Sequence, residues 1–315
     1  MYPTTHADDP VIRRDSAASV HRLYPAPAQH SSNPAPGVPY TPMQARLSLG
    51  FAEDNGATRL VDRSHFGPLI VQKPLYPEGR EVCQVVIVHP PGGVVGGDEL
   101  EINARVGVSG KAQITTPGAA KWYKANGHVS RQNIRLEVGT GASLEWVPQE
   151  TIFFDDVNVV LDHQVLLAKE ASYISCEILC FGRTASGESF TKGQIMQRIG
   201  IRRDDKLIWF EQLRLSGGGS AMESSLILAG STVCATLIAV GKAVPATVLD
   251  AAREGAGAIA NGAGHLGVSQ LKPVVVARYL GDSSETARRI MLHIWGLLRP
   301  EMLGRQAMVP RMWNT

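Results

Sequence analysis

Two stretches of the chain repeat one local pattern at a spacing near 32 residues. Residues 106–114 (VGVSGKAQI) and residues 138–146 (VGTGASLEW) each read as a short strand, a glycine turn and a second short strand. A proline follows each unit, at Pro117 and Pro148. Because one such unit cannot bury its apolar face alone, a repeat of this kind is typical of strand layers that stack on one another. The pattern therefore favours a β-helix or a β-sandwich.

Strand patterns also occur on both sides of this repeat. Apolar and polar residues alternate over residues 45–51, and Asn55-Gly56 then offers a type I′ hairpin turn. In the segment 171–181, Cys176 and Ile178 share one face of a strand while Glu177 points to the opposite face. The strands expected elsewhere cover residues 82–88, 194–202, 232–240 and 271–279.

Helical patterns are expected in the C-terminal third. Pro245 stands at a first-turn position for residues 246–260, whose apolar residues keep a helical period. Asp282 and Glu285 form a capping box for a second helix, which is expected to stop before Pro300. We therefore predict a mainly β fold of helically stacked strand layers, β-helix-like or sandwich-like, with two or so α-helices toward the C-terminus.

The first 42 residues differ from the rest in composition. Prolines alternate there with Ala, Ser, His and Gln, and no hydrophobic period holds. Such a segment cannot bury enough apolar surface to offset the entropy of ordering. We predict a disordered, Pro-rich N-terminal extension over residues 1–42 and a single domain over residues 43–315. At 44% hydrophobic residues, the chain has enough apolar material for that domain's core.

Charge and composition exclude several classes of function. A net charge of +2 gives no dedicated nucleic-acid surface. Residues 121–124 (KWYK) interleave basic and aromatic side chains, but the charge around them is balanced, so we interpret them as a strand face or partner contact. The apolar stretches fall short of a membrane span of ~20 residues, and the N-terminus lacks a signal peptide's apolar region. Four cysteines are too few for a disulfide framework. We expect a soluble, cytoplasmic protein.

The motifs of several enzyme classes are missing from the sequence. Residues 107–112 lack the glycine spacing and the Ser/Thr of a phosphate loop, and no G-x-S-x-G elbow or zinc-type spacing occurs. What remains is a set of carboxylates in strand and turn contexts. A pair of them could run a glycosidase-like hydrolysis, or several could line a path for a divalent cation. Sequence spacing alone does not separate these two hypotheses.

Two glycine-containing loops stand out. Residues 89–98 (HPPGGVVGGD) join two strands through prolines that fix φ and glycines that permit positive φ. We interpret this loop as a structural turn. In residues 182–188 (GRTASGE), an opposite-charge pair is expected to close another turn. The motif residues to which we assign a structural role are His89, Pro90, Pro91, Gly92, Gly93, Arg183 and Glu188.

Four short motifs together resemble those of the urease accessory protein D family, also named urease accessory protein H. They are HPPGGVVGGD at residues 89–98, TTPGA at 115–119, EWVPQE at 145–150 and GRTASGE at 182–188. They occur in the family's order and spacing. The resemblance runs from about residue 44 to residue 215, and the C-terminal third is compatible with it. The N-terminal extension departs from the family pattern.

This resemblance implies a maturation factor that is not an enzyme. Family members join urease accessory protein F and the GTPase urease accessory protein G in a complex that binds urease apoprotein. That complex acts as a scaffold or chaperone that helps install the nickel centre, and GTP is hydrolysed by the GTPase partner. The resemblance also implies a helically wound stack of strands and no tightly bound cofactor, with nickel only in transit. The alternative is an all-β hydrolase that uses a carboxylate pair.

A nickel path would need ligands that release the ion. Thiolates or several histidines would hold Ni²⁺ too long, whereas carboxylates exchange it. We expect Asp98, Glu177 and Glu211 to line such a path, with Glu150 behind them. Glu177 is opposite the apolar face of its strand, and Glu211 interrupts an apolar strand. The alternative for each residue is a solvent-facing position on a strand.

Overall fold

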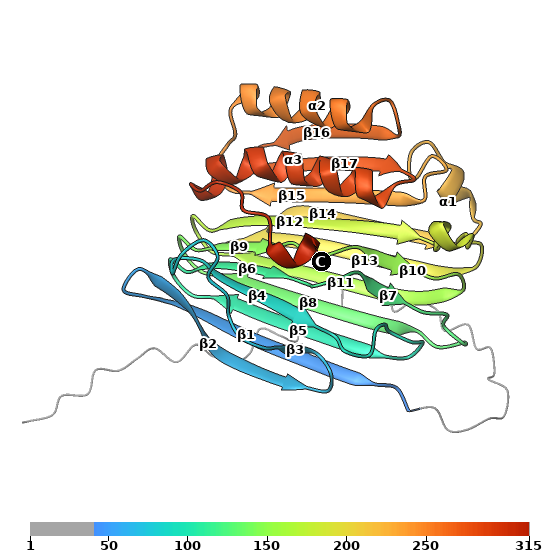
Figure 1. Cartoon of the computed structure of the whole chain (residues 1–315), viewed down its shortest axis with the longest axis horizontal. Helices are drawn as coiled ribbons and strands as arrows, with labels where there is room; N and C mark the ends of the chain where they lie inside the picture. The colour runs from blue at the N-terminus through green and yellow to red at the C-terminus, as the bar shows by residue number, and fades with distance from the viewer. Residues whose placement is uncertain (1–40, 315) are drawn as a thin grey trace, which may run out of the picture. The chain divides into compact units, whose positions relative to one another are not determined.

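The computed structural model describes residues 41–314, and Figure 1 shows them as layers of strands with helices beside them. The extension predicted for residues 1–42 lies, up to residue 40, outside the described residues. The first strand begins at Gln44, so the domain boundary predicted at residue 43 falls one residue before an element of structure.

The first of two sheets has seven strands in the order β14-β13-β11-β8-β5-β1-β2. Its inner strands run parallel to their neighbours, and β2 and β14 close the two edges as antiparallel strands. The strands are β1 (Gln44–Asp54), β2 (Ala57–Phe66), β5 (Glu99–Val106), β8 (Ser130–Val138), β11 (Val157–Leu167), β13 (Gly193–Arg203) and β14 (Lys206–Ser216).

The second sheet follows the path β16-β17-β15-β12-β9-β6-β4-β3, and the short strands β10 and β7 continue from β12. The strands are β3 (Ile70–Val71), β4 (Cys83–Val88), β6 (Lys111–Thr115), β7 (Ala120–Trp122), β9 (Ser143–Trp146), β10 (Thr151–Phe153), β12 (Ser172–Phe181), β15 (Val233–Val240), β16 (His265–Leu271) and β17 (Val274–Gly281).

The chain alternates between the two sheets and climbs one layer at each return. Val106 of β5 lies beside Val138 of β8, and Lys111 of β6 lies beside Ser143 of β9. The 32-residue sequence repeat is therefore the spacing between two stacked layers. Each layer covers the apolar side of the one before it, which is how a solenoid builds a continuous core. The predicted fold is confirmed, in its β-helix-like form.

The space between the sheets is filled by apolar side chains. Leu47 and Leu136 of the seven-stranded sheet and Leu144 and Tyr173 of the ten-stranded sheet are fully buried there. Alternation within each strand sends every second side chain inward, as the period of a strand requires. Burial of one such aliphatic side chain stabilises the fold by about 1.5–3 kcal/mol.

Two turns show what the sequence patterns did and did not capture. Asn55 and Gly56 have φ of 51° and 76°, so the type I′ turn predicted between β1 and β2 is confirmed. The single strand predicted over residues 271–279 is wrong, because β16 ends at Leu271 and β17 begins at Val274. Lys272 adopts a φ of 57°, and the proline after it has no N–H for a ladder, so the chain turns back there.

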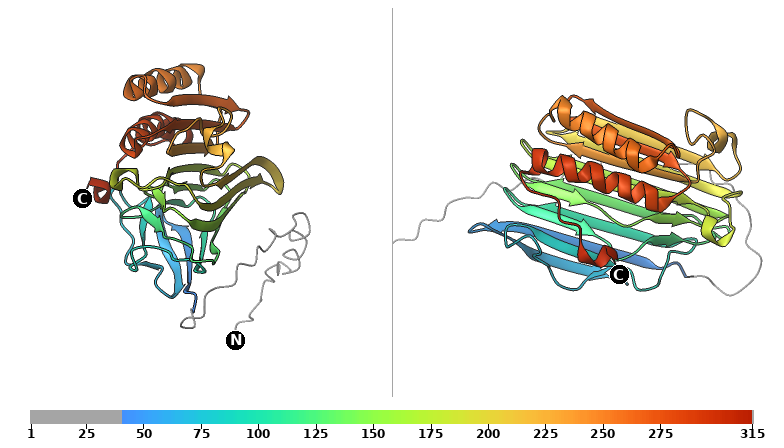
Figure 2. Two further views of the ribbon diagram at one scale, coloured as in Figure 1. Left: turned by 90° about the vertical axis from the view of Figure 1, so that its right-hand side faces the viewer. Right: turned by 45° about the horizontal axis from the view of Figure 1, so that its top comes forward.

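The C-terminal helices pack on one face of the β12-β15-β17-β16 region (Figure 2). They are α2 (Ala246–Ala260) and α3 (Ser284–Leu303), and a short helix α1 (Ser220–Glu223) precedes them. Cys176, Ile178 and Cys180 contact this helical layer, whereas Tyr173 faces the interior. The face assignment predicted for β12 is therefore confirmed. Among the described residues, none of the helices is both long enough and apolar enough to cross a membrane.

The second predicted helix begins and ends differently from expectation. Its cap is Ser283, whose Oγ accepts the Thr286 N–H at 3.1 Å, while Asp282 accepts the Thr232 N–H at 2.9 Å. The helix also continues through Pro300 to Leu303. Arg299 beside the proline is fully buried, so tertiary packing outweighs the one hydrogen bond that the proline removes.

Candidate functional site

Asp98, the first predicted path residue, ties the loop 89–98 to the first strand. Its Oδ1 accepts the Met43 N–H at 2.9 Å and its Oδ2 accepts the Val95 N–H at 3.0 Å. The residue is 2% exposed. Both carboxylate oxygens therefore have backbone partners, and the residue fixes the start of β1 against the loop.

The loop 89–98 packs as a further layer against β7. Val94 forms a bridge with Trp122, and a Cβ atom on Gly93 would lie 2.3 Å from the Tyr123 ring. A Cβ on Gly96 would lie 1.8 Å from the carbonyl oxygen of Ala125. These close approaches require glycine, as a structural turn packed against the neighbouring layer would.

His89 begins this loop and is half-buried. Burial lowers the pKa of its imidazole, against the opposing effect of the nearby Asp98 charge. A neutral histidine fits the structural role expected for it. Pro90, Pro91 and Gly92 follow on the exposed side of the turn.

The pair predicted in the loop 182–188 is present. Arg183 Nη2 lies 2.5 Å from Glu188 Oε2, and Glu188 Oε1 accepts the Asp155 N–H at 2.9 Å. The Arg183 guanidinium lies 4.2 Å over the Phe154 ring, and Tyr123 contacts that ring edge-on at 4.7 Å. Tyr123, Phe154 and Arg183 follow β7, β10 and β12 in successive layers. The segments that follow these three strands therefore stack on one another at one end of the solenoid.

Glu150 lies on the helical side of the ten-stranded sheet. Its Oε1 is 2.5 Å from Arg288 Nη2 and 2.8 Å from Arg288 Nε, and Arg288 belongs to α3. The side chain thus joins the solenoid to the helical layer. The structure does not bring it together with Asp98.

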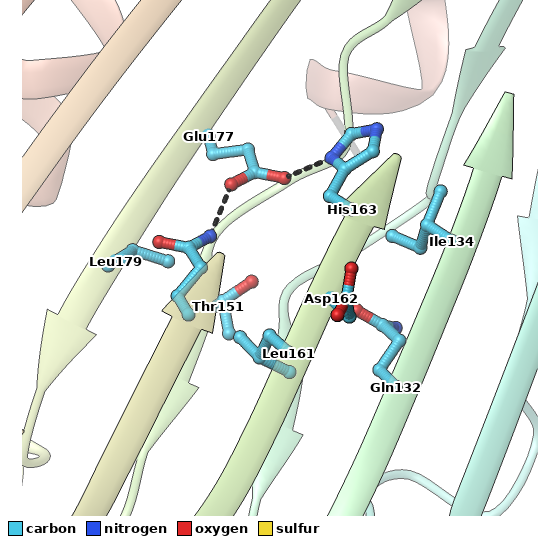
Figure 3. A pocket seen from close by; sticks show the side chains of 9 residues that line it. Gln132, Ile134, Thr151, Leu161, Asp162, His163, Glu177 and Leu179 are labelled. Carbon is cyan, nitrogen blue, oxygen red and sulfur yellow. Dashed lines mark hydrogen bonds and ion pairs between the residues drawn. The ribbon is translucent and has the colours of Figure 1, made fainter. Parts of the chain in front are cut away.

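Glu177 projects from β12 into the space between the sheets. Its Oε1 lies 3.3 Å from His163 Nδ1, and its Oε2 accepts the Gln197 Nε2–H at 2.6 Å. Figure 3 marks the contact between Glu177 and His163 with a dashed line. On the other side of the imidazole, the Tyr173 hydroxyl lies 3.3 Å from His163 Nε2. Three strands therefore build one polar cluster, which we call the interior cluster: Tyr173 and Glu177 from β12, His163 from β11 and Gln197 from β13.

A cavity of about 20 Å³ adjoins the interior cluster and holds roughly one water-sized sphere. Its polar lining comes from Glu177, His163, Gln197, Gln132 and Thr151. Asp162, which pairs with Arg198 at 2.6 Å, also lines it, and the apolar residues Ile134, Leu161 and Leu179 complete the wall. A mainly apolar core thus contains one small polar space with a carboxylate and an imidazole at its edge.

Glu211 lies near this cluster on the facing sheet. Its Oε1 is 2.5 Å from Arg278 Nη2, and Arg278 Nε is 3.3 Å from Thr236 Oγ1. Thr236 is the direct cross-strand neighbour of both Glu177 and Arg278. Directly opposed residues of antiparallel strands point to the same face. Glu177 and Arg278, the partner of Glu211, therefore point to the same side of the ten-stranded sheet, with β15 between their strands.

Residues 43–314 match the model of the family described as UreD urease accessory protein. The chain belongs to this family. The urease accessory protein UreD of Nitrosospira multiformis is 58% identical over 275 residues, which cover 87% of this chain and 99% of that protein. The UreD of Janthinobacterium sp. (strain Marseille) is 59% identical over 272 residues, covering 86% and 92%. The resemblance seen in the four motifs is confirmed, and it assigns the chain a role in urease maturation.

The UreD-family interior offers few metal ligands in one place. Within residues 41–314, no three His, Cys, Asp or Glu side chains are grouped to hold a metal ion. The interior cluster supplies two, Glu177 and His163. A pair of this kind binds a divalent cation weakly, since stable metal sites in proteins use three or four side chains.

Sequence reasoning missed His163, Tyr173 and Gln197. The sequence does indicate a buried position for His163, because this residue continues the alternation of Val159, Leu161 and Val165, all of which point inward. A histidine in register with buried aliphatic residues is expected in the interior. The contact between that histidine and Glu177 depends on two strands from different sheets, which no local pattern predicts.

Proposed function

We propose that this UreD-family chain is a scaffold, not an enzyme, that binds urease apoprotein together with urease accessory proteins F and G. In that complex it helps insert nickel into the urease active site, and the interior of its solenoid is a passage for Ni²⁺. The observation that carries the passage is the interior cluster, where a carboxylate and an imidazole meet beside a cavity within a mainly apolar core.

Burial of a carboxylate in such a core needs a reason. A buried polar group costs free energy unless it is hydrogen-bonded, and apolar residues would fill the space without that cost. In the interior cluster, Gln197 and His163 satisfy Glu177 and so keep an anionic oxygen inside the solenoid. A carboxylate with one imidazole suits a borderline cation such as Ni²⁺ and releases it readily.

The sequence is consistent with a complex in which this chain provides the nickel passage and another protein hydrolyses the nucleotide. The chain has no phosphate loop, so the nucleotide chemistry belongs to accessory protein G. Of the predicted path residues, Glu177 points to the interior side of the ten-stranded sheet, and Glu211 pairs with Arg278 on that same side. The proposed passage therefore runs through them, while path roles for Asp98 and Glu150 stay predictions.

Co-expression with the urease subunits and accessory proteins F and G, in the cytoplasm of a host without urease, tests this function. We expect a tagged form of the chain to co-purify with urease apoprotein and both accessory proteins. We expect urease activation in nickel and bicarbonate to fail when this chain alone is omitted. Activation at the full level without it, or turnover of a glycoside by the purified chain, would contradict the proposal.

A further inference from the structure

We propose that Glu177 and His163 Nδ1 form a two-ligand transfer site for Ni²⁺, and that Tyr173 lets the site accept the ion without changing the charge of the imidazole. This inference rests on the proposed function, because it assigns the chemistry of the same passage. His163 and Tyr173 belong to neither the sequence motifs nor the predicted path.

The first step is the placement of the proton on the imidazole. A neutral imidazole carries one N–H, and the other nitrogen accepts a hydrogen bond. His163 Nδ1 faces Glu177 Oε1, and His163 Nε2 faces the Tyr173 hydroxyl, each at 3.3 Å. Because a carboxylate only accepts, the proton lies on Nδ1 and Nε2 accepts from the hydroxyl when no cation is bound.

The second step is the arrival of a cation between Glu177 and His163. The ion takes the lone pair of Nδ1, so the Nδ1 proton passes to solvent water and Nε2 takes one proton from solvent water in exchange, with no net release of a proton. The imidazole keeps one proton and stays neutral. The Tyr173 hydroxyl changes from donor to acceptor toward Nε2, since a phenol can do both. Phenylalanine at this position would leave the new Nε2–H without a partner.

The surroundings of Tyr173 hold it in this double role. The residue is fully buried, and burial raises the pKa of its hydroxyl, so the group remains a neutral phenol. Ser175 lies two residues further along β12 on the same face, and its hydroxyl can accept a hydrogen bond from the phenol when the phenol oxygen accepts one from His163.

The ligands themselves are held in place by two further contacts. Gln197 Nε2 donates to Glu177 Oε2 at 2.6 Å, which turns the other carboxylate oxygen toward His163. The Trp146 ring meets the His163 ring edge-on, with centroids 5.7 Å apart. Both contacts fix the orientation of a ligand, so a cation can enter and leave without rearrangement of the core.

The test uses the purified full chain and Ni²⁺ alone, with affinity measured by competition against a metallochromic dye. We expect His163→Gln and Glu177→Gln to lose most of the affinity. We expect Tyr173→Phe to lose about tenfold, because a buried N–H is left unsatisfied. The matched control is Glu137→Gln on the outer face of β8, where the carboxylate is 41% exposed, and its affinity should equal that of the unchanged chain.

A measurement on the unchanged chain keeps the inference testable if a variant fails to fold. With ¹⁵N-labelled histidine and Zn²⁺ as a diamagnetic substitute, the His163 resonances should move from the Nδ1–H to the Nε2–H tautomer on titration. A His163 ring that keeps its tautomer and shows no metal-induced shift would overturn the inference.

Comparison of Ni²⁺ affinity with urease nickel loading distinguishes failure of the two-ligand site from failure of the proposed passage. If Ni²⁺ binding depends on His163 and Glu177 but urease nickel loading does not, the site stands and the passage is wrong. If loading depends on Glu177 but Ni²⁺ affinity is unchanged in His163→Gln, the passage stands and this site is wrong.

Discussion

Glu145 of β9 and Arg299 of α3 form a fully buried ion pair between the solenoid and its helical layer. Arg299 Nη2 lies 2.9 Å from Glu145 Oε1, and Arg299 Nε lies 3.0 Å from Oε2. Trp295 Nε1 donates to the same carboxylate at 2.8 Å, and Glu78 contacts the guanidinium at 2.7 Å. The two charges are thus both paired and hydrogen-bonded, which is the condition under which buried charges are tolerated.

Removal of one member of this pair should destabilise the protein strongly. Glu145→Ala leaves a buried guanidinium undercompensated, and we expect a loss of about 3–5 kcal/mol in the free energy of unfolding. The control is Arg135→Ala, which breaks an exposed pair with Glu137 and should cost at most about 1 kcal/mol. Urea denaturation measures both. Equal, small losses would contradict the assigned role of the buried pair.

The loop 89–98 should tolerate no side chain at its closest approach to the neighbouring layer. Gly96→Ala places a Cβ against the Ala125 carbonyl oxygen, so we expect a lower thermal midpoint and a loss of about 1–3 kcal/mol. Gly118→Ala is the matched control, because a Cβ there meets no atom within 4 Å. A Gly96→Ala protein as stable as the control would show that the loop is free to move away.

The Arg183–Glu188 pair should contribute a pH-dependent part of the stability. The hydrogen bond from Arg183 holds the pKa of Glu188 below its ordinary value of 4.5. A lowered pKa means that the contribution is present above the unfolded-state pKa and is lost as pH falls through the folded-state pKa. Glu188→Gln should therefore be less stable than the unchanged chain at pH 7, and the difference should shrink below about pH 4.5. A difference independent of pH would contradict this assignment.

The cysteines should be inert in the folded protein. Burial raises the pKa of Cys176 and of Cys180 to about 12, and burial also raises the pKa of Cys83 and Cys234. The thiolate is the reactive form, so at pH 8 we expect a thiol-specific dye to label the folded chain slowly. In denaturant all four thiols should react. Rapid stoichiometric labelling of the folded chain would contradict the burial of these side chains.

The stacked strand layers could be predicted from the sequence because the layers repeat at a regular spacing along the chain. The spacing of residues 106–114 and 138–146 is the layer spacing itself, and strand alternation placed Glu177 on the face opposite Cys176 and Ile178. Glycine and proline chemistry likewise gave the turn at Asn55-Gly56. The alternation and the turn depend on residues within a few positions of one another, and the layers recur at one fixed spacing along the chain.

The parts that the sequence did not predict depend on contacts between distant segments. Arg299 meets Glu145 across 154 positions, and that burial keeps α3 intact through Pro300. His163 meets Glu177 only because β11 and β12 lie in different sheets that face each other. A sequence does not show which partner a strand carboxylate has. In the structure, Asp98 accepts hydrogen bonds from two backbone N–H groups, and Glu150 forms an ion pair with Arg288.

The proposed passage of Ni²⁺ through the solenoid interior at Glu177 is tested most directly by the nickel content of urease. Urease would be matured with the Glu177→Gln chain, and nickel per urease active site would be measured by mass spectrometry beside the Glu137→Gln control. We expect both variants to co-purify with urease and the accessory proteins. We also expect nickel loading to fall several-fold with Glu177→Gln and to be unchanged with Glu137→Gln. Full nickel loading with an intact Glu177→Gln complex would contradict the proposed passage.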